Sequence, residues 1–375
     1  MIKKKVAILS NFPVWLVNDT VPAIPGHYPV WLLPLYSAFS THSCPYEIHW
    51  LILHKGIKDN IYFEQNQQHF HVIKATKISI GLFSAYIYDR ARLTKELNRI
   101  NPDLIHTWGT EYCYGLAGCD YQKATWLHSV QGILKSCMEM GPTNWFIRLH
   151  SMYEPGVIKK APHITTESPW AAEQIKKLCS HAEPILWDYA VEDRFFQAER
   201  KLSSSPCYLY CGASSPLKNV QTIISAFSHK ELAHVQLVLA GPDRREYENL
   251  PPNIHPVGRV SRDEVVRLMS ESWGLIHPSL VDTGPTVAKE ARVMGLPVII
   301  STHCGSQQYV DHGKSGFVIS PRDVDALVQG VLQLSASTAQ NLSMGAHGQE
   351  KCREALSSET MCSGLLKIYQ NLLGN

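Results

Sequence analysis

The stretch DTGPTVAKEA at positions 282–291 is followed at once by RVMGLPVII at positions 292–300. Together they predict a tight turn, a short helix, a corner and a buried β-strand, in that order. Gly284 permits the turn, and Pro285 fits the first helical position because its fixed φ suits a helix and its missing N–H would have no partner there. This succession of elements is typical of one unit of a parallel α/β sheet.

The start of this predicted helix carries groups suited to binding an anion. The backbone N–H groups of Thr286 and Val287 would point out of the first turn, where the helix dipole favours phosphate. Two carboxylates, Asp282 and Glu290, lie on either side of that position. On their spacing alone they could equally be an acid at a helix start and a solvated helix residue, so the surrounding sequence has to decide.

The length and composition indicate a globular chain of two domains. Its 375 residues exceed the usual size of one core, and 45% hydrophobic with 18% charged residues excludes disorder. A net charge of +2 gives no electrostatic case for nucleic-acid binding. The ten cysteines show neither disulfide nor zinc spacing, which predicts reduced thiols in a cytoplasmic protein.

No segment of the sequence predicts insertion into a membrane. The apolar run at positions 6–9 is too short for the core of a signal peptide and is expected to be the first strand. No window reaches the roughly 18 consecutive apolar residues of a membrane helix. We therefore expect no transmembrane segment, and the three lysines at positions 3–5 are the single hint of attraction to a membrane surface.

Short apolar runs alternate with amphipathic stretches over most of the chain, which predicts an α/β fold of repeated βα units around parallel sheets. The strands expected in the first half are 6–10, 47–54, 71–74, 104–107, 125–129 and 163–166. Those expected in the second half are 208–212, 236–240, 254–257, 274–277, 297–301 and 317–319. The clearest helices are expected at 83–99, 220–229, 263–269, 286–294, 324–334 and 361–373.

A polar segment at positions 192–206 predicts the boundary between the two domains. We expect an N-terminal domain at residues 1–187 and a second domain at residues 188–359. The apolar pattern of the last helix, at residues 360–375, would allow it to pack on either domain.

The first loop of the second domain is a further candidate for phosphate binding. Gly212, Ser214 and Lys218 follow a predicted strand and precede a helix, so they would face the crevice at the strand ends. Such loops are common, and a solvated surface lysine is the alternative interpretation of Lys218.

Taken together, these segments resemble the family 4 retaining glycosyltransferases of the GT-B fold. In that family an acidic residue is followed, after seven residues, by Glu-Ala and then by Gly-Leu-Pro-Val. Here these are Asp282, Glu290-Ala291 and positions 295–298, and the similarity continues through GSQQYVDHGKSGFV at 305–318. The resemblance covers residues 205–335 strongly. In the first half it is limited to NPDLIH at 101–106 and WLHS at 126–129.

The resemblance implies two Rossmann-like domains that face each other across a cleft, with the C-terminal helix crossing back to the N-terminal domain. Glu290 would hold the ribose hydroxyls of a nucleotide sugar, Asp282 the sugar hydroxyls, and Lys218 the diphosphate. The backbone around Arg259 and Val260 would border the base. The full donor-binding set is then Gly212, Ser214, Lys218, Arg259, Val260, Asp282, Gly284, Thr286, Val287 and Glu290.

The same resemblance places His128 across the cleft, near the sugar and the acceptor. With Asp282 and Lys218 it would form the catalytic set. Gly26 and His27, in a turn expected to face the cleft, and His106 are the candidates for binding the acceptor. Most tryptophans are expected in the core or the cleft wall.

The sequence departs from the family pattern at two donor-site positions. Ala213 stands where a basic residue is usual, which removes one cation from the leaving diphosphate, and Arg292 and Lys289 are candidates to replace it. Asp282 replaces the commoner glutamate and is one methylene shorter. These changes keep open the possibility of a nucleotide-sugar-binding subunit that has lost turnover.

The implied function is a retaining hexosyltransferase. It would use a UDP or GDP sugar and a glycan or lipid-linked acceptor, in polysaccharide or glycolipid biosynthesis at the inner membrane surface. The first half holds no Asp-X-Asp motif after a strand, so we expect no cofactor and no metal ion at the diphosphate. A GT-B epimerase is the other alternative, although it would need additional acid and base carboxylates in the cleft.

Overall fold

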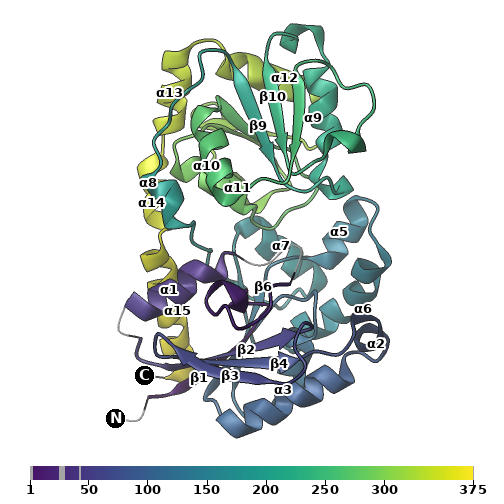
Figure 1. The fold of residues 1–375 in the computed structure, drawn as a ribbon, viewed down its shortest axis with the longest axis vertical. Coiled ribbons are helices and arrows are strands. Elements are labelled where there is room, and N and C mark those ends of the chain that lie inside the picture. The colour runs from purple at the N-terminus through teal and green to yellow at the C-terminus, as the bar shows by residue number, and fades with distance from the viewer. Residues whose placement is uncertain (1–2, 25–29, 42–43, 375) are drawn as a thin grey trace.

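The computed structural model describes residues 3–24, 30–41 and 44–374. Two sheets, each flanked by helices, form two lobes (Figure 1). The larger has the order β3 (Ile61–Gln65), β4 (Gln68–Lys74), β2 (Glu47–His54), β1 (Lys5–Leu9), β5 (Leu104–Trp108), β6 (Thr125–Val130), β7 (His163–Thr166), β8 (Ile185–Leu186). The smaller has the order β11 (Ile254–Gly258), β10 (Gln236–Ala240), β9 (Cys207–Cys211), β12 (Gly274–His277), β13 (Val298–Ser301), β14 (Gly316–Ile319).

Apart from the antiparallel pair β3 and β4, all strand pairs in both sheets are parallel. The helices of the first lobe are α1 (Leu32–Thr41), α2 (Ile78–Phe83), α3 (Ile87–Ile100), α4 (Tyr114–Asp120), α5 (Leu134–Met140), α6 (Trp145–Lys160) and α7 (Pro169–Leu178). Those that follow are α8 (Asp193–Gln197), α9 (Val220–Phe227), α10 (Arg262–Glu271), α11 (Thr286–Val293), α12 (Val324–Leu334), α13 (Thr338–Ala346), α14 (Gln349–Ala355) and α15 (Ser358–Leu373). The predicted α/β class is confirmed.

Two local predictions for the first lobe were wrong. Strand β3 was not expected; it pairs with β4 through a hairpin in which Asn66 and Gln67 both have positive φ. The helix expected at 83–99 is α3, but it begins only at Ile87, because Ala85 and Tyr86 adopt the left-handed conformation and separate it from α2, which was not predicted. The Tyr86 ring is buried there, and its hydroxyl lies 2.8 Å from Nε2 of His150.

The C-terminal helix joins the two lobes. It follows α14, which packs on α11 beside the second sheet, and α15 then runs along α1 on one face of the first sheet (Figure 1). Leu365 and Tyr369 are fully buried in the core that Val6 and Trp50 form on that face of the first sheet. The predicted return of this helix to the N-terminal half is confirmed.

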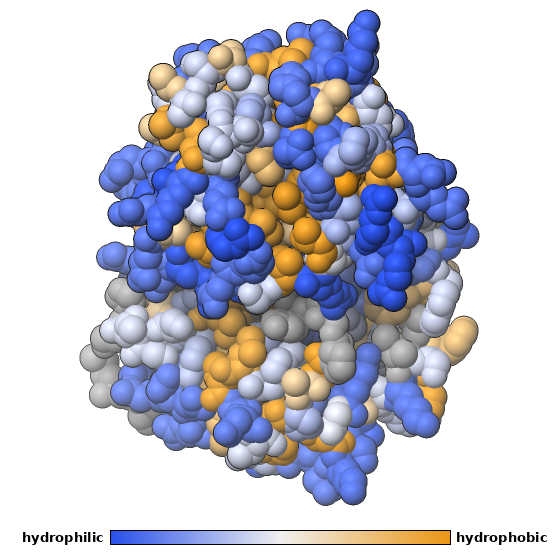
Figure 2. All heavy atoms as spheres, turned by 45° about the horizontal axis from the view of Figure 1, so that its top comes forward, coloured by the Kyte–Doolittle hydropathy of each residue, from blue (hydrophilic) through white to orange (hydrophobic). Residues whose placement is uncertain are grey.

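The helices of the described residues do not suit a membrane span. On the face drawn in Figure 2, hydrophobic side chains gather near the centre and hydrophilic ones surround them. Among residues 3–24, 30–41 and 44–374, no helix has both the length and the apolar character that a membrane span requires.

Candidate functional site

The predicted donor residues follow the carboxyl ends of the strands of the second sheet. Because these strands are parallel, the loops after β9, β12 and β13 emerge at one edge, where open α/β sheets bind ligands. Asp282, after β12, forms a parallel bridge with Cys304, after β13. The loop after β9 is tied to the same place, since the Leu280 amide donates to the Leu217 carbonyl at 2.8 Å.

Lys218 and Asp282 form an ion pair at this edge. The Lys218 ammonium donates to Asp282 Oδ2, and His277 Nε2 lies 3.1 Å from the same oxygen. Burial pushes the pKa of Asp282 upward, but Lys218 and His277 overcome that effect and hold it below its ordinary value. Asp282 is therefore an anion at neutral pH and can accept hydrogen bonds from hydroxyl groups.

Glu290 lies in α11 and has 1% of its surface exposed. Arg262, in the first turn of α10, donates to its Oε1 and also binds Glu192. Glu290 Oε2 is buried and has no hydrogen-bond partner among the described residues. Burial raises the pKa of this carboxyl group, and Arg262 opposes the rise. One oxygen is thus held in place while the other remains available to a ligand.

The turn before α11 has the predicted form, with one shift of position. Pro285 is the residue before the helix rather than its first member, and Ala288 donates the first intrahelical bond to the Pro285 carbonyl. The amides of Thr286 and Val287 therefore belong to the first turn, whose N–H groups have no partner within the helix. A Cβ atom on Gly284 would lie 2.2 Å from the Glu167 carboxylate, so any other residue there would displace that buried group.

Glu167 belongs to a charged cluster that sequence reasoning missed. Lys289 is 1% exposed and donates to Glu167 Oε2 at 2.7 Å and to Asp188. The Tyr309 hydroxyl donates to the other Asp188 oxygen at 2.7 Å. Burial raises the pKa of Glu167 to about 7, while Lys289 counteracts the rise. The cluster joins α11 to the loop after β7.

The two lobes also contact each other at the turn before α11. The Thr283 hydroxyl donates to the Gln131 carbonyl, just after β6, and the Thr283 carbonyl accepts from the Ser168 hydroxyl at 2.8 Å. A Cβ atom on Gly305 would lie 1.7 Å from that carbonyl oxygen. The predicted sugar-binding turn therefore lies directly against the strand ends of the first sheet.

Neither Lys289 nor Arg292 can supply the cation that is missing at Ala213. Lys289 is enclosed by carboxylates, as described above. Arg292 is 1% exposed. Its guanidinium donates hydrogen bonds to backbone carbonyls of the second lobe, those of Leu296, Tyr309, Gly345 and His347. The expectation that either residue compensates for Ala213 was wrong, because each is already part of the folded core.

The other donor residues lie along the same edge of the sheet. Gly212 is half-buried, and Gly241, after β10, approaches so closely that a Cβ there would lie 1.9 Å from the Gly212 carbonyl oxygen. Ser214 and Arg259 are exposed and Val260 is half-buried. These positions leave room for a ligand beside them, and their contacts with a nucleotide stay a prediction.

His128 is fully buried on β6. Its Nδ1 lies 2.8 Å from the Thr107 hydroxyl, and its Nε2 has no partner among the described residues. Its Cε1 faces α4, 3.1 Å from where a Cβ on Gly115 would lie. Burial lowers the pKa of His128 to about 4, so the ring is neutral at pH 7. It has no exposed surface for a substrate to contact, and its catalytic role stays a prediction.

His106 differs from the expectation for an acceptor residue. It is fully buried, with Nδ1 2.7 Å from the Tyr369 hydroxyl and Nε2 2.7 Å from the Ser129 hydroxyl. Both nitrogens are thus engaged in the core, where they tie β5 to α15. The other two acceptor candidates, Gly26 and His27, lie outside the described residues.

Glu111 is an acid at the carboxyl edge of the first sheet that was not predicted. Cβ atoms on Gly109, after β5, and on Gly132, after β6, would each lie 2.4 Å from one of its oxygens. Burial raises the pKa of Glu111 to about 7. An acid four residues beyond a predicted strand was the available sequence signal. Its shifted pKa makes it a candidate for the acceptor side of the cleft.

Comparison with known proteins agrees with this arrangement. Residues 191–351 match the model of the glycosyl transferases group 1. The two parallel-sheet lobes with a returning C-terminal helix form the GT-B fold.

Among curated proteins, the chain is 26% identical over 164 residues to the N-acetyl-alpha-D-glucosaminyl L-malate synthase of Bacillus anthracis, covering 42% of this chain and 43% of that protein. It is 22% identical over 242 residues to the sucrose-phosphate synthase of Spinacia oleracea, covering 56% of this chain and 22% of that one. The chain thus spans less than half the length of either relative.

Among solved structures, a sucrose-phosphate synthase from Thermosynechococcus elongatus superimposes with a TM-score of 0.78 at 17% identity, over 99% of this chain and 100% of that one. HepE of Anabaena, in complex with UDP and glucose, gives 0.71 at 14% identity, over 98% of this chain and 100% of that one. At these identities the likeness concerns the fold.

Proposed function

We propose that the protein transfers a hexosyl group, with retention of configuration, from a nucleotide-diphosphate sugar to a hydroxyl group of a glycan or lipid-linked acceptor. The observation that carries the proposal is Glu290, a fully buried carboxylate with one oxygen held by Arg262 and the other unpartnered. An unpaired buried carboxylate oxygen is costly, and a ribose diol would supply the missing donor.

The groups at the start of α11 and in the loop after β9 suit the departing diphosphate. Cleavage of the glycosidic bond builds negative charge on the leaving phosphate, so fixed donors aimed at it are the main catalytic need. In the proposed reaction Lys218 and the amides of Thr286 and Val287 provide them, and Asp282 accepts from the sugar hydroxyls. The acceptor attacks on the face from which the phosphate leaves, and that phosphate takes the acceptor proton.

Two relatives indicate which donor and acceptor to test first. HepE of Anabaena was solved in complex with UDP-glucose, which supports a uridine nucleotide sugar. WaaG, described as a glycosyltransferase involved in lipopolysaccharide biosynthesis, has a TM-score of 0.70 with this chain and supports a glycolipid or polysaccharide acceptor. In our proposal residues 188–359 bind the donor. Residues 1–187, with residues 360–375, bind the acceptor at the inner face of a membrane.

The donor is tested by thermal shift with UDP, GDP, ADP and CMP sugars, followed by transfer assays. One nucleotide at about 100 times its dissociation constant should stabilise the protein by roughly 2.7 kcal/mol. Transfer should continue in EDTA and should not increase on addition of Mg²⁺ or Mn²⁺. Binding without turnover would instead identify a degenerate subunit, and release of nucleotide and free sugar without an acceptor would identify an epimerase.

Lys218→Met should lower kcat for transfer by about 10- to 100-fold, since a charged hydrogen bond contributes about 1.5–3 kcal/mol. The loss also leaves Asp282 without its cation beside the diphosphate. Lys230→Met, which removes an exposed lysine of the same lobe, is the control and should behave as wild type. Equal rates for the two variants would remove Lys218 from the mechanism.

A further inference from the structure

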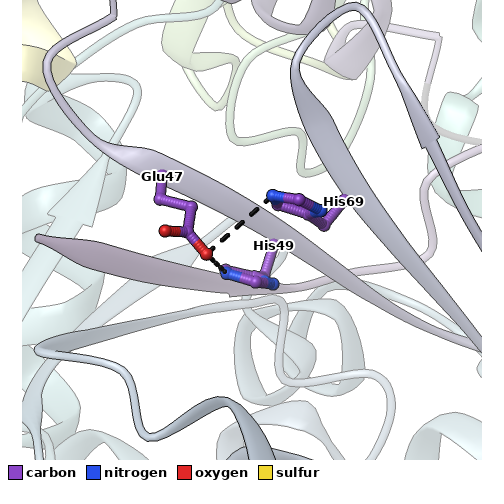
Figure 3. Close-up of side chains that lie close together, drawn as sticks. All are labelled: Glu47, His49 and His69. Atoms are coloured by element: carbon purple, nitrogen blue, oxygen red, sulfur yellow. Dashed lines mark hydrogen bonds and ion pairs between the residues drawn. The ribbon is translucent and has the colours of Figure 1, made fainter. Parts of the chain in front are cut away.

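A second polar cluster lies on the first sheet, away from the donor groups. Glu47 and His49 project from one face of β2, and His69 is the register partner of His49 on β4 (Figure 3). Glu47 Oε1 lies 2.9 Å from His49 Nε2 and 3.9 Å from His69 Nε2. Glu47 begins β2, at the amino end of the strand, whereas the donor groups meet the carboxyl ends of this sheet.

His49 is also the second member of a chain of four polar groups, three of which are buried. Its Nδ1 lies 3.0 Å from His71 Nε2, and His71 Nδ1 lies 2.9 Å from Glu96 Oε1. With the contact to Glu47, the chain has three contacts, and each needs one proton to be a hydrogen bond. Glu47 and Glu96, at its two ends, can only accept when they are ionised.

The two ends of this chain face different groups. Arg99 lies 2.7 Å from Glu96 at the far end. At the near end, Lys5 lies 3.8 Å from Glu47 Oε1. The third imidazole, His69, also lies at this end, stacked on the His49 ring with 4.7 Å between the ring centroids.

The surroundings orient the His49 imidazole as a metal ligand. Metal-bound histidines usually donate their other N–H to a neighbouring acceptor, which fixes the ring and its tautomer. His49 has this support from His71 and, beyond it, Glu96. His69 Nδ1 lies 3.7 Å from Glu64 Oε2, which is beyond hydrogen-bonding distance.

The cluster is open enough for an ion to enter. The ligand atoms of Glu47, His49 and His69 lie within 4.8 Å of one another. The edge of a zinc tetrahedron is about 3.3 Å, given metal–nitrogen distances near 2.0 Å. His49 is nearly buried, but the side chains of Glu47 and His69 are 32% and 34% exposed and are free to close the remaining gap.

We propose that Glu47, His49 and His69 bind one zinc ion, with water in the fourth position. Two imidazoles and one carboxylate are a ligand set that suits Zn²⁺. The ion ties β2 to β4 and adjoins the buried chain of His49, His71 and Glu96. It lies apart from the donor groups, so the site is independent of the proposed transfer reaction.

The test is calorimetric titration of the metal-free full-length protein with ZnCl₂ at pH 7.5. Wild type should bind one equivalent, and His69→Asn should bind it at least tenfold more weakly. The control is His229→Asn. His229 also lies near a carboxylate, 3.2 Å from Glu231, but it is in the second lobe and outside the cluster. This variant should bind zinc as wild type does.

Titration with Co²⁺ supplies a readout of coordination. Wild type and His229→Asn should develop the visible absorption of cobalt bound to nitrogen in a four-coordinate site, and His69→Asn should lose it. Absence of saturable zinc binding by wild type would overturn the proposal. So would equal zinc affinity of His69→Asn and wild type, because another group, such as one of the cysteines, would then be the ligand.

Discussion

Glu290→Gln is expected to lower kcat/KM for the nucleotide sugar by at least about 100-fold. The carboxylate would accept two charged hydrogen bonds from the ribose, each contributing about 1.5–3 kcal/mol. The amide keeps the shape of the side chain but presents an N–H where one of these acceptors was. Because Glu290 is 1% exposed, no water can take over the lost contact. Initial rates of transfer and calorimetric binding of the donor measure the effect.

Glu192→Gln is the matched control. Glu192 accepts from the same guanidinium, Arg262, at 2.8 Å but is not part of the predicted ribose site. If Glu290→Gln acts only by releasing Arg262, the two variants should lose similar donor affinity. A loss confined to Glu290→Gln supports the ribose contact, and unchanged donor affinity in both would contradict the proposed function.

Lys289→Met is expected to destabilise the protein by about 3–5 kcal/mol, the usual cost of breaking a buried ion pair from one side. Lys289 is 1% exposed, and its removal leaves Glu167 and Asp188 close together without a cation. Burial and the two carboxylates have opposed effects on its pKa, and the carboxylates prevail and raise it, so the lysine is charged at neutral pH. Urea unfolding followed by tryptophan fluorescence measures the loss.

A second substitution distinguishes charge from packing. Lys289→Met combined with Glu167→Gln should recover part of the lost stability, because one of the two uncompensated carboxylates is gone. Lys314→Met, at an exposed lysine, should leave the unfolding curve unchanged. If the double variant is no more stable than Lys289→Met, the cost lies in packing rather than in charge.

The fold was predictable where the local pattern is strong. Alternating apolar runs and amphipathic stretches led to the two parallel sheets, and the resemblance led to the returning helix. Strand β3 was not predicted, because its alternate residues are exposed at the sheet edge and it carries no continuous apolar run. The break between α2 and α3 at Ala85 and Tyr86 was not predicted, because the site that buries the Tyr86 ring is formed by α6, more than 60 residues further along the chain.

The candidate site likewise has features that the sequence predicted and features that it did not. Asp282, Glu290 and the turn between them lie within nine consecutive residues, so their spacing along one strand end and one helix was visible in the sequence. His277 was in view as the end of a predicted strand, and Arg262 stood next to a predicted helix, but no sequence signal paired them with Asp282 and Glu290. The burial of His106 and His128 was equally hidden, because it depends on helices packed against the sheet.

Residue order within DTGPTVAKEA was therefore sufficient to specify a turn, a helix start and two carboxylates at defined positions, since backbone conformation over ten residues depends mainly on local sterics and hydrogen bonding. Which charges those carboxylates face was decided by the tertiary structure. Lys218 is 64 residues from Asp282, and Glu167 is 122 residues from Lys289. Only the packing of two sheets brings such groups within hydrogen-bonding distance, and burial then makes their pairing obligatory.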